Sequence, residues 1–192
     1  GNHECRDFTQ AYGFYDECMR KFGSAKVWNY FTGLFDYLPL AALIESQVLC
    51  VHGGLSPAVN TIDDIRQINR AQNIPRETLF TGLLWSDPVD GEGWLPSPRG
   101  AGHLFGIDIS KRFNHANGLK FITRGHQLCL EGYQWVHDGN VLTVYSASSH
   151  CFRSGSQGGL AQFSDNMELT FHRYYCSGDT DPTLERRLPL EL

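Results

Sequence analysis

The residue types best suited to bind a metal ion stand at three separate places in this sequence. Asn2 follows a glycine, His52 opens a His-Gly-Gly triplet, and His126 closes an Arg-Gly-His triplet. Together they offer one amide oxygen and two imidazole nitrogens, a set that suits manganese, iron or zinc better than calcium. We therefore predict that these three side chains bind one divalent ion.

Taken singly, each histidine has a simpler interpretation. A lone buried histidine is more often a hydrogen-bonded core residue than a metal ligand. For His52, the two glycines that follow favour the ligand, because they would let the backbone pass close to a bound substrate. His126 directly follows an apolar strand, and active-site residues of open sheets gather at such strand ends.

Two more side chains could act on a phosphate ester at this site. Two-metal phosphate hydrolysis uses cations roughly 3.5–4 Å apart that acidify a bridging water. His3 adjoins Asn2, and an imidazole can protonate a departing alkoxide near neutral pH. The guanidinium of Arg99 matches two phosphate oxygens, and small residues surround it in the sequence. The alternatives are a surface histidine at a helix start and an arginine in a solvated turn.

These residues need strands and loops to bring them together, and hydrophobic periodicity predicts the elements. Two buried strands, at 47–51 and 120–123, would end just before His52 and His126. A long ordered functional loop at 73–102 would carry Arg99. The other predicted helices are 5–22, which Gly23 stops, one from a Ser24 cap to before Pro39, 61–69 with a capping-box-like start at Thr61, and 107–116. Two hairpins are also predicted, one with strands 133–137/141–145 around Asp-Gly-Asn and one with strands 160–163/168–174 around Asp-Asn. Residues 177–192 read as an exposed tail.

Composition limits the class of protein. The 192 residues are 41% hydrophobic and 19% charged, which fits one globular domain. The net charge of -5 argues against a nucleic-acid partner, and no apolar run is long enough to span a membrane. Six scattered cysteines form no C-x-x-C pair, so we expect reduced thiols in a reducing compartment. We expect a cytoplasmic location, with the nucleus as a second one.

Five ordered motifs resemble those of the phosphoprotein phosphatase family of Ser/Thr phosphatases. They are residues 1–4, 52–57, 84–88, 97–102 and 124–126. Residues 12–18, 34–40 and 113–119 narrow the resemblance to the type 2A catalytic subunit or a close relative. The resemblance runs from residue 1 to about residue 163. It implies an α/β fold, a metallophosphoesterase-like β-sandwich flanked by helices.

The resemblance also implies roles for single residues. The Asn-His-His set would bind the second of two divalent ions, either manganese or iron and zinc. His3 would be the general acid, and Arg99 would bind the substrate phosphate. Tyr12 and Trp85 match positions that line the family's substrate grooves. His150 stands where the family has a substrate-facing tyrosine, because residues 146–150 read Ser-Ala-Ser-Ser-His.

Other family motifs are absent from the sequence. The Gly-Asp-x-His-Gly and Gly-Asp-x-x-Asp-Arg-Gly motifs supply the first metal's ligands, the bridging aspartate and a second phosphate-binding arginine. We therefore expect residues 1–176 to be the C-terminal part of a larger catalytic domain that is inactive by itself. The family's Asp-Tyr-Phe-Leu terminus, a methylation site, is also absent.

The function expected from these residues is dephosphorylation of phosphoserine and phosphothreonine in proteins. Phosphoproteins, and the scaffold and regulatory subunits of a type 2A-like holoenzyme, would be its partners. Two alternatives remain at this stage. One is a non-catalytic fragment or pseudophosphatase that acts as an interaction module. The other is a metallophosphoesterase that acts on nucleotides, against which the Leu-Trp-Ser-Asp-Pro and Ser-Pro-Arg-Gly-Ala-Gly stretches count.

Overall fold

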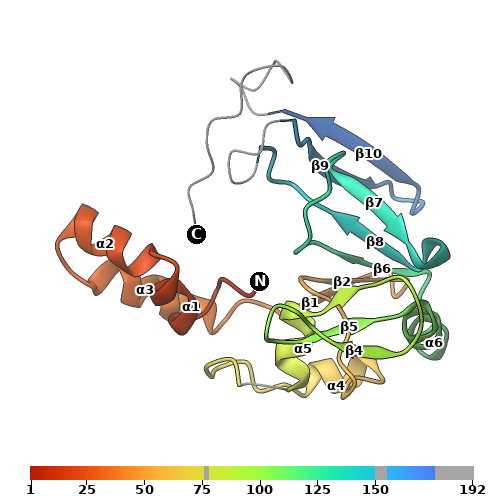
Figure 1. The fold of residues 1–192 in the computed structure, drawn as a ribbon, viewed down its shortest axis with the longest axis horizontal. Helices are drawn as coiled ribbons and strands as arrows, with labels where there is room; N and C mark the ends of the chain where they lie inside the picture. Colours follow the sequence, from red (N-terminus) through yellow and green to blue (C-terminus); the bar gives the residue numbers. More distant parts are fainter. Residues whose placement is uncertain (76–77, 150–154, 176–192) are drawn as a thin grey trace.

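The computed structural model describes residues 1–75, 78–149 and 155–175. A helical lobe lies on one side of a two-sheet body, and a long hairpin lies on the other side (Figure 1). The lobe is formed by the first 35 residues, so Asn2 and His3 lie where the lobe joins the body.

A five-stranded mixed sheet forms the centre of the body. In spatial order its strands are β1 (Ala41–Ile44), β2 (Val48–Val51), β6 (Phe121–Arg124), β8 (Val141–Val144) and β7 (Tyr133–Val136). The three inner strands run parallel, and the two outer strands are antiparallel to their neighbours. Because β2 and β6 are parallel neighbours, the loops after them open at the same edge of the sheet. That edge carries the two candidate histidines.

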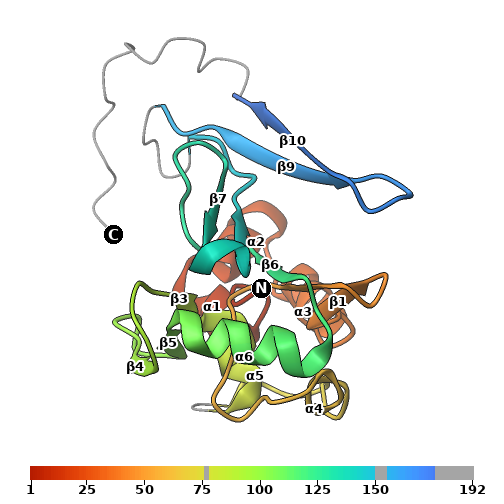
Figure 2. The same ribbon diagram turned by 90° about the vertical axis from the view of Figure 1, so that its right-hand side faces the viewer.

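A second layer covers one face of this sheet. It consists of α4 (Ile62–Arg66), α5 (Leu79–Trp85), α6 (Ile107–Asn117) and a small sheet of β3 (Asp87–Pro88), β5 (His103–Phe105) and β4 (Trp94–Pro96). The helix α6 runs along this layer in Figure 2. The core between the layers includes Leu49, Leu83, Phe105, Ile122 and Val141, all at most 1% exposed. Together the two layers confirm the expected α/β sandwich flanked by helices.

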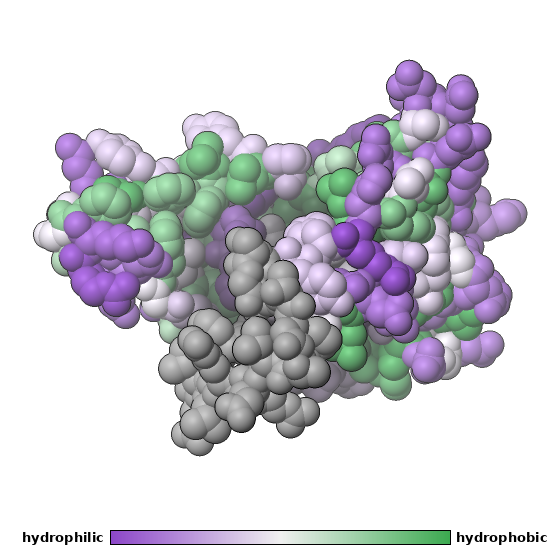
Figure 3. Space-filling view, turned by 90° about the horizontal axis from the view of Figure 1, so that it is seen from above, coloured by the Kyte–Doolittle hydropathy of each residue, from purple (hydrophilic) through white to green (hydrophobic). Residues whose placement is uncertain are grey.

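The helical lobe differs from the prediction of one helix over residues 5–22. The structure has α1 (Arg6–Ala11) and α2 (Phe14–Phe22), separated by Gly13. Gly13 has a φ of 91°, a left-handed conformation that ends one helix and turns the chain into the next. Gly23 ends α2 as predicted, and α3 (Lys26–Phe35) follows. Figure 3 shows apolar residues gathered over this lobe, and the exposed ones include Phe22, Tyr30, Phe31, Leu34 and Tyr37.

The segment 73–102 was predicted as a loop, but it contains α5, β3 and β4. The helix α5 begins after Thr78, whose hydroxyl caps it, and buries Phe80, Leu83 and Leu84. At seven residues it is too short to give a clear helical period, so burial rather than propensity accounts for it. The helix α4 has the predicted capping box at Thr61 but ends at Arg66 rather than near residue 69.

The two hairpins are confirmed. The first is formed by β7 and β8, and the second by β9 (Gly158–Phe163) and β10 (Leu169–Tyr174). The expected tail at 177–192 lies outside the described residues. No helix in the described ranges combines the length and apolar character that crossing a bilayer needs.

Candidate metal and phosphate site

The three predicted metal ligands meet at one point. The Nε2 atom of His52 lies 2.8 Å from Oδ1 of Asn2 and 3.2 Å from Nδ1 of His126. Ligands at about 2.1 Å from a common ion, and at right angles to one another, lie about 3 Å apart. The spacing of the three donor atoms therefore fits one shared ion, although 50 and 74 residues separate them in sequence.

The sheet edge explains this convergence. His52 follows β2 directly, and His126 lies two residues beyond β6. The amide of Gly125 donates to the carbonyl of His52 at 3.1 Å, which ties the two loops together. His126 has a φ of 62°, a conformation that is uncommon for a residue other than glycine and that gathers at functional sites.

The electrostatic environment keeps both imidazoles neutral. Burial, together with the positive charge of Arg124, lowers the pKa of His52 well below its ordinary value. Burial and the nearby Arg99 lower the pKa of His126 to about 3. A metal ligand must offer a free lone pair, so these shifts suit both residues to metal binding.

The donor atom of His126 at the shared point is Nδ1, and the second ring nitrogen does not contribute to it. The Nε2 atom of His126 is buried and has no hydrogen-bond partner within the described part of the chain. Within the described ranges, no group of three or more His, Cys, Asp or Glu residues could by itself hold an ion. The predicted Asn-His-His set offers at most three donors, so a second ion would need ligands beyond it.

Arg99 lies beside this point and is held by a carboxylate. Its Nε donates to Oδ2 of Asp87 at 2.6 Å, and its Nη2 lies 3.5 Å from the carbonyl oxygen of His126. Asp87 is only 3% exposed, whereas the Arg99 side chain is 34% exposed. The free face of the guanidinium can thus receive an anion next to the predicted ion.

The same carboxylate pairs with a second arginine that is wholly buried. Arg124 Nη2 donates to Oδ1 of Asp87 at 2.6 Å, and its Nε donates to the carbonyl of Gly53 at 2.5 Å. Its Nη1 also donates to the side chain of Gln127 at 2.9 Å. Arg124 therefore anchors Asp87 against the sheet, and Asp87 in turn orients Arg99.

Aromatic rings form one side of the site. His3 is exposed, and its ring packs edge-on against Phe8 with a centroid separation of 4.5 Å. Phe8 stacks on Tyr12 at 4.1 Å and contacts Trp85 at 5.0 Å. Trp85 reaches the His126 ring at 5.8 Å. These contacts link His3, Tyr12 and Trp85 to the metal ligands as one continuous surface.

The glycines of His-Gly-Gly have a structural role that sequence reasoning missed. A Cβ on Gly53 would lie 2.6 Å from the backbone of Leu84, and one on Gly54 would lie 2.3 Å from the Phe105 ring. These glycines therefore let the loop after β2 pack against α5 and the core. The expected role, close approach to substrate, is not needed to explain them.

Replacing Gly54 with Ala should therefore destabilise the fold, because Phe105 is fully buried and cannot move aside. Overpacking of this kind costs about 1–3 kcal/mol. Thermal unfolding of the variant should show the loss. Gly91→Ala is a matched control for added bulk, since no atom lies within 4 Å of its Cβ position, although its positive φ adds local strain. Equal stability of Gly54→Ala and the parent protein would contradict this role.

Sequence reasoning predicted the ligands and Arg99 but assigned no role to Asp87, Arg124 or Phe8. Asp87 stands in the Leu-Trp-Ser-Asp-Pro stretch, where an Asp before Pro also fits an ordinary turn. His115 is exposed. His137 is buried and hydrogen-bonded, which indicates a structural role. His150 lies outside the described residues.

The fold is a mixed α/β sandwich, and one edge of its sheet brings Asn and His donors beside an arginine that a carboxylate holds in place. This combination is typical of a metallophosphoesterase. The model of the calcineurin-like phosphoesterase family matches residues 1–130, and the chain belongs to this family. A solved structure of a protein serine/threonine phosphatase from Saccharomyces cerevisiae, described as similar to human phosphatase PP5, is 37% identical with a TM-score of 0.85. The match covers 92% of this chain and 59% of the yeast chain.

Proposed function

We propose that this chain provides part of the active site of a metal-dependent protein serine/threonine phosphatase of the type 2A kind. The observation that carries the proposal is the meeting of Asn2, His52 and His126 beside Arg99. Hydrolases of phosphate esters need a cation and a phosphate clamp next to each other. The likeness to a yeast Ser/Thr phosphatase supports a protein substrate.

Each residue would have a separate task in this reaction. Asn2, His52 and His126 would hold one divalent ion, for which manganese, iron and zinc are the candidates. Such ions acidify water and offset phosphate charge when they are bound. Arg99 would bind two phosphate oxygens, with its position set by Asp87.

The leaving group would be protonated on the side of the site that the aromatic rings form. His3 would give its proton to the seryl or threonyl oxygen as the ester bond to phosphorus breaks. The rings of Phe8, Tyr12 and Trp85 lie beside it and offer a surface for the substrate peptide. A peptide chain lying on these rings would be shielded from water on that side.

The test is substrate preference of the full-length gene product with added manganese. We expect turnover of phosphoserine and phosphothreonine peptides, and little turnover of nucleoside monophosphates or cyclic nucleotides. Preference for nucleotides would overturn the proposed substrate class. Absence of any metal-dependent turnover would favour the non-catalytic alternative.

The ligand assignment can be tested without activity. His126→Asn removes one imidazole donor, so we expect bound manganese or zinc, measured by elemental analysis after gel filtration, to fall at least tenfold. His115→Asn is the matched control, since His115 lies exposed on α6, away from the metal ligands. Equal metal content in both variants would show that His126 is not a ligand.

A further inference from the structure

A cavity of about 310 Å³ opens beside the metal and phosphate site. Its walls include Pro88, which follows Asp87, and Gln127, which follows His126. The Oε1 atom of Gln127 accepts a hydrogen bond from Arg124, the arginine that anchors Asp87. The cavity and the phosphate clamp therefore share one side-chain network. A ligand that reaches the clamp can extend into this space.

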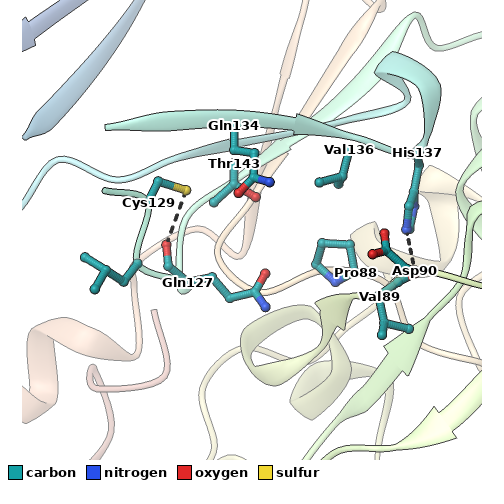
Figure 4. A pocket seen from close by; sticks show the side chains of 10 residues that line it. Pro88, Val89, Asp90, Gln127, Cys129, Gln134, Val136, His137 and Thr143 are labelled. Carbon is teal, nitrogen blue, oxygen red and sulfur yellow. Dashed lines mark hydrogen bonds between the residues drawn. The ribbon is translucent and has the colours of Figure 1, made fainter. Parts of the chain in front are cut away.

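The two walls of the cavity differ in chemistry. In Figure 4, Gln134, Val136 and Thr143 lie along the sheet wall, and Pro88 and Val89 lie across from them. Gln134 and Thr143 are paired across β7 and β8, so their side chains share one face of the sheet. The cavity thus combines apolar surface with a few polar groups, as small ligand sites do.

Two of the polar side chains in the lining form no hydrogen bond with another described residue. Thr143 is 3% exposed, yet its hydroxyl forms no hydrogen bond with any described residue. The side-chain amide of Gln134 likewise makes none within the described ranges. His137 is different, because its two ring nitrogens are occupied by Ser110 Oγ and the Val89 carbonyl, each at 2.9 Å. The Thr143 hydroxyl, in a residue that is nearly buried, and the Gln134 amide, in a residue that is exposed to solvent, are therefore free to bond a ligand in the cavity.

The charge of the lining limits what that ligand can be. No Lys or Arg stands among the described lining residues, and the one carboxylate, Asp90, belongs to an exposed residue. An anionic side chain would face this carboxylate without a partner. A cationic side chain would gain only one solvent-exposed ion pair, which contributes little. A purely apolar side chain would leave Thr143 and the amides unpaired.

We propose that this cavity receives an uncharged hydrogen-bonding side chain of the substrate, namely Asn, Gln, Ser or Thr, a few residues from the phosphorylated residue. The inference rests on the proposed phosphatase function and adds a sequence preference to it. Thr143 and Gln134 would be the residues that determine this preference. An extended peptide advances about 3.3–3.6 Å per residue, so a neighbouring position of the substrate can reach the cavity.

The experiment measures kcat/KM of the full-length gene product on phosphoserine peptides that carry Gln, Leu, Glu, Lys or Ala at each position near the phosphoserine. We expect Gln to be preferred over the other four at one position by about 3- to 10-fold, the usual effect of one or two hydrogen bonds. Thr143→Val keeps the side-chain shape and should remove most of this preference. Thr143→Ser should keep it.

Two controls separate specificity from folding. Thr170→Val makes the same change on the exposed face of β10, outside the cavity lining, and should leave the preference intact. The readout within each variant is the ratio of kcat/KM for the Gln peptide to that for the Ala peptide, so a general loss of activity or folding does not imitate a loss of preference. If no phosphopeptide is hydrolysed, the proposed function itself fails. If peptides are hydrolysed without a positional preference, or Thr143→Val retains the preference, only this inference fails.

Discussion

Replacing His3 with Asn should lower kcat on phosphoserine peptides by about 10²–10⁴-fold, which is the usual contribution of a general acid. The alkoxide that leaves phosphoserine is strongly basic and needs a proton as its bond to phosphorus breaks. Asn keeps a polar side chain of similar size but has no proton to give. His3 is exposed, packs against Phe8 and adjoins the predicted ligand Asn2 in sequence, which is consistent with the proposed role of acid.

The loss should be much smaller on p-nitrophenyl phosphate, whose phenolate leaves without protonation. Metal content should stay nearly unchanged, because the Asn-His-His set remains in place. The measurement is steady-state kinetics on both substrates, with elemental analysis of the same samples. His115→Asn again serves as the control. Equal losses on the two substrates, together with loss of metal, would make His3 a ligand or a structural residue.

Replacing Asp87 with Ala should damage both the fold and phosphate binding. The Arg124 side chain is 0% exposed, and Asp87 is its only carboxylate partner among the described residues. Leaving a buried charge without its partner costs about 3–5 kcal/mol. For a protein of this size that corresponds to a fall in melting temperature of roughly 6–20 °C. KM should rise as well, because Arg99 loses the carboxylate that orients it.

Two variants test the cause of this loss. Asp63→Ala breaks the exposed pair with Arg66 and should change stability little, because both side chains are solvated. Adding Arg124→Met to Asp87→Ala removes the unpaired buried charge, so much of the lost stability should return while KM remains high. Thermal melts and phosphopeptide kinetics measure the two effects separately. A double variant less stable than Asp87→Ala would show that the buried charge is not the cause.

Helices, strands and turns were predicted correctly where a few neighbouring residues specify them, such as an apolar run, a turn sequence or a helix cap. The strands β2 and β6 were expected from their apolar runs, and the β7–β8 hairpin from Asp-Gly-Asn between alternating strands. Gly23 and the Thr61 capping box marked helix ends correctly. The break at Gly13 was missed because its flanking residues continue the helical spacing of apolar residues. The helix α5 was missed because seven buried residues among prolines and glycines carry no readable period.

The sequence likewise predicted only some of the residues of the candidate site. Residue types and the family resemblance predicted Asn2, His52 and His126 as metal ligands and His3 and Arg99 as the acid and the phosphate clamp, and the structure brings the three predicted ligands together beside Arg99. Residue type could not identify Asp87, because a carboxylate's importance depends on which charges are buried beside it. Only the parallel pairing of β2 with β6 brings donors 74 residues apart to within 3.2 Å. The sequence determined the chemistry of the side chains, and tertiary packing decided which of them meet and which charges are shielded from water.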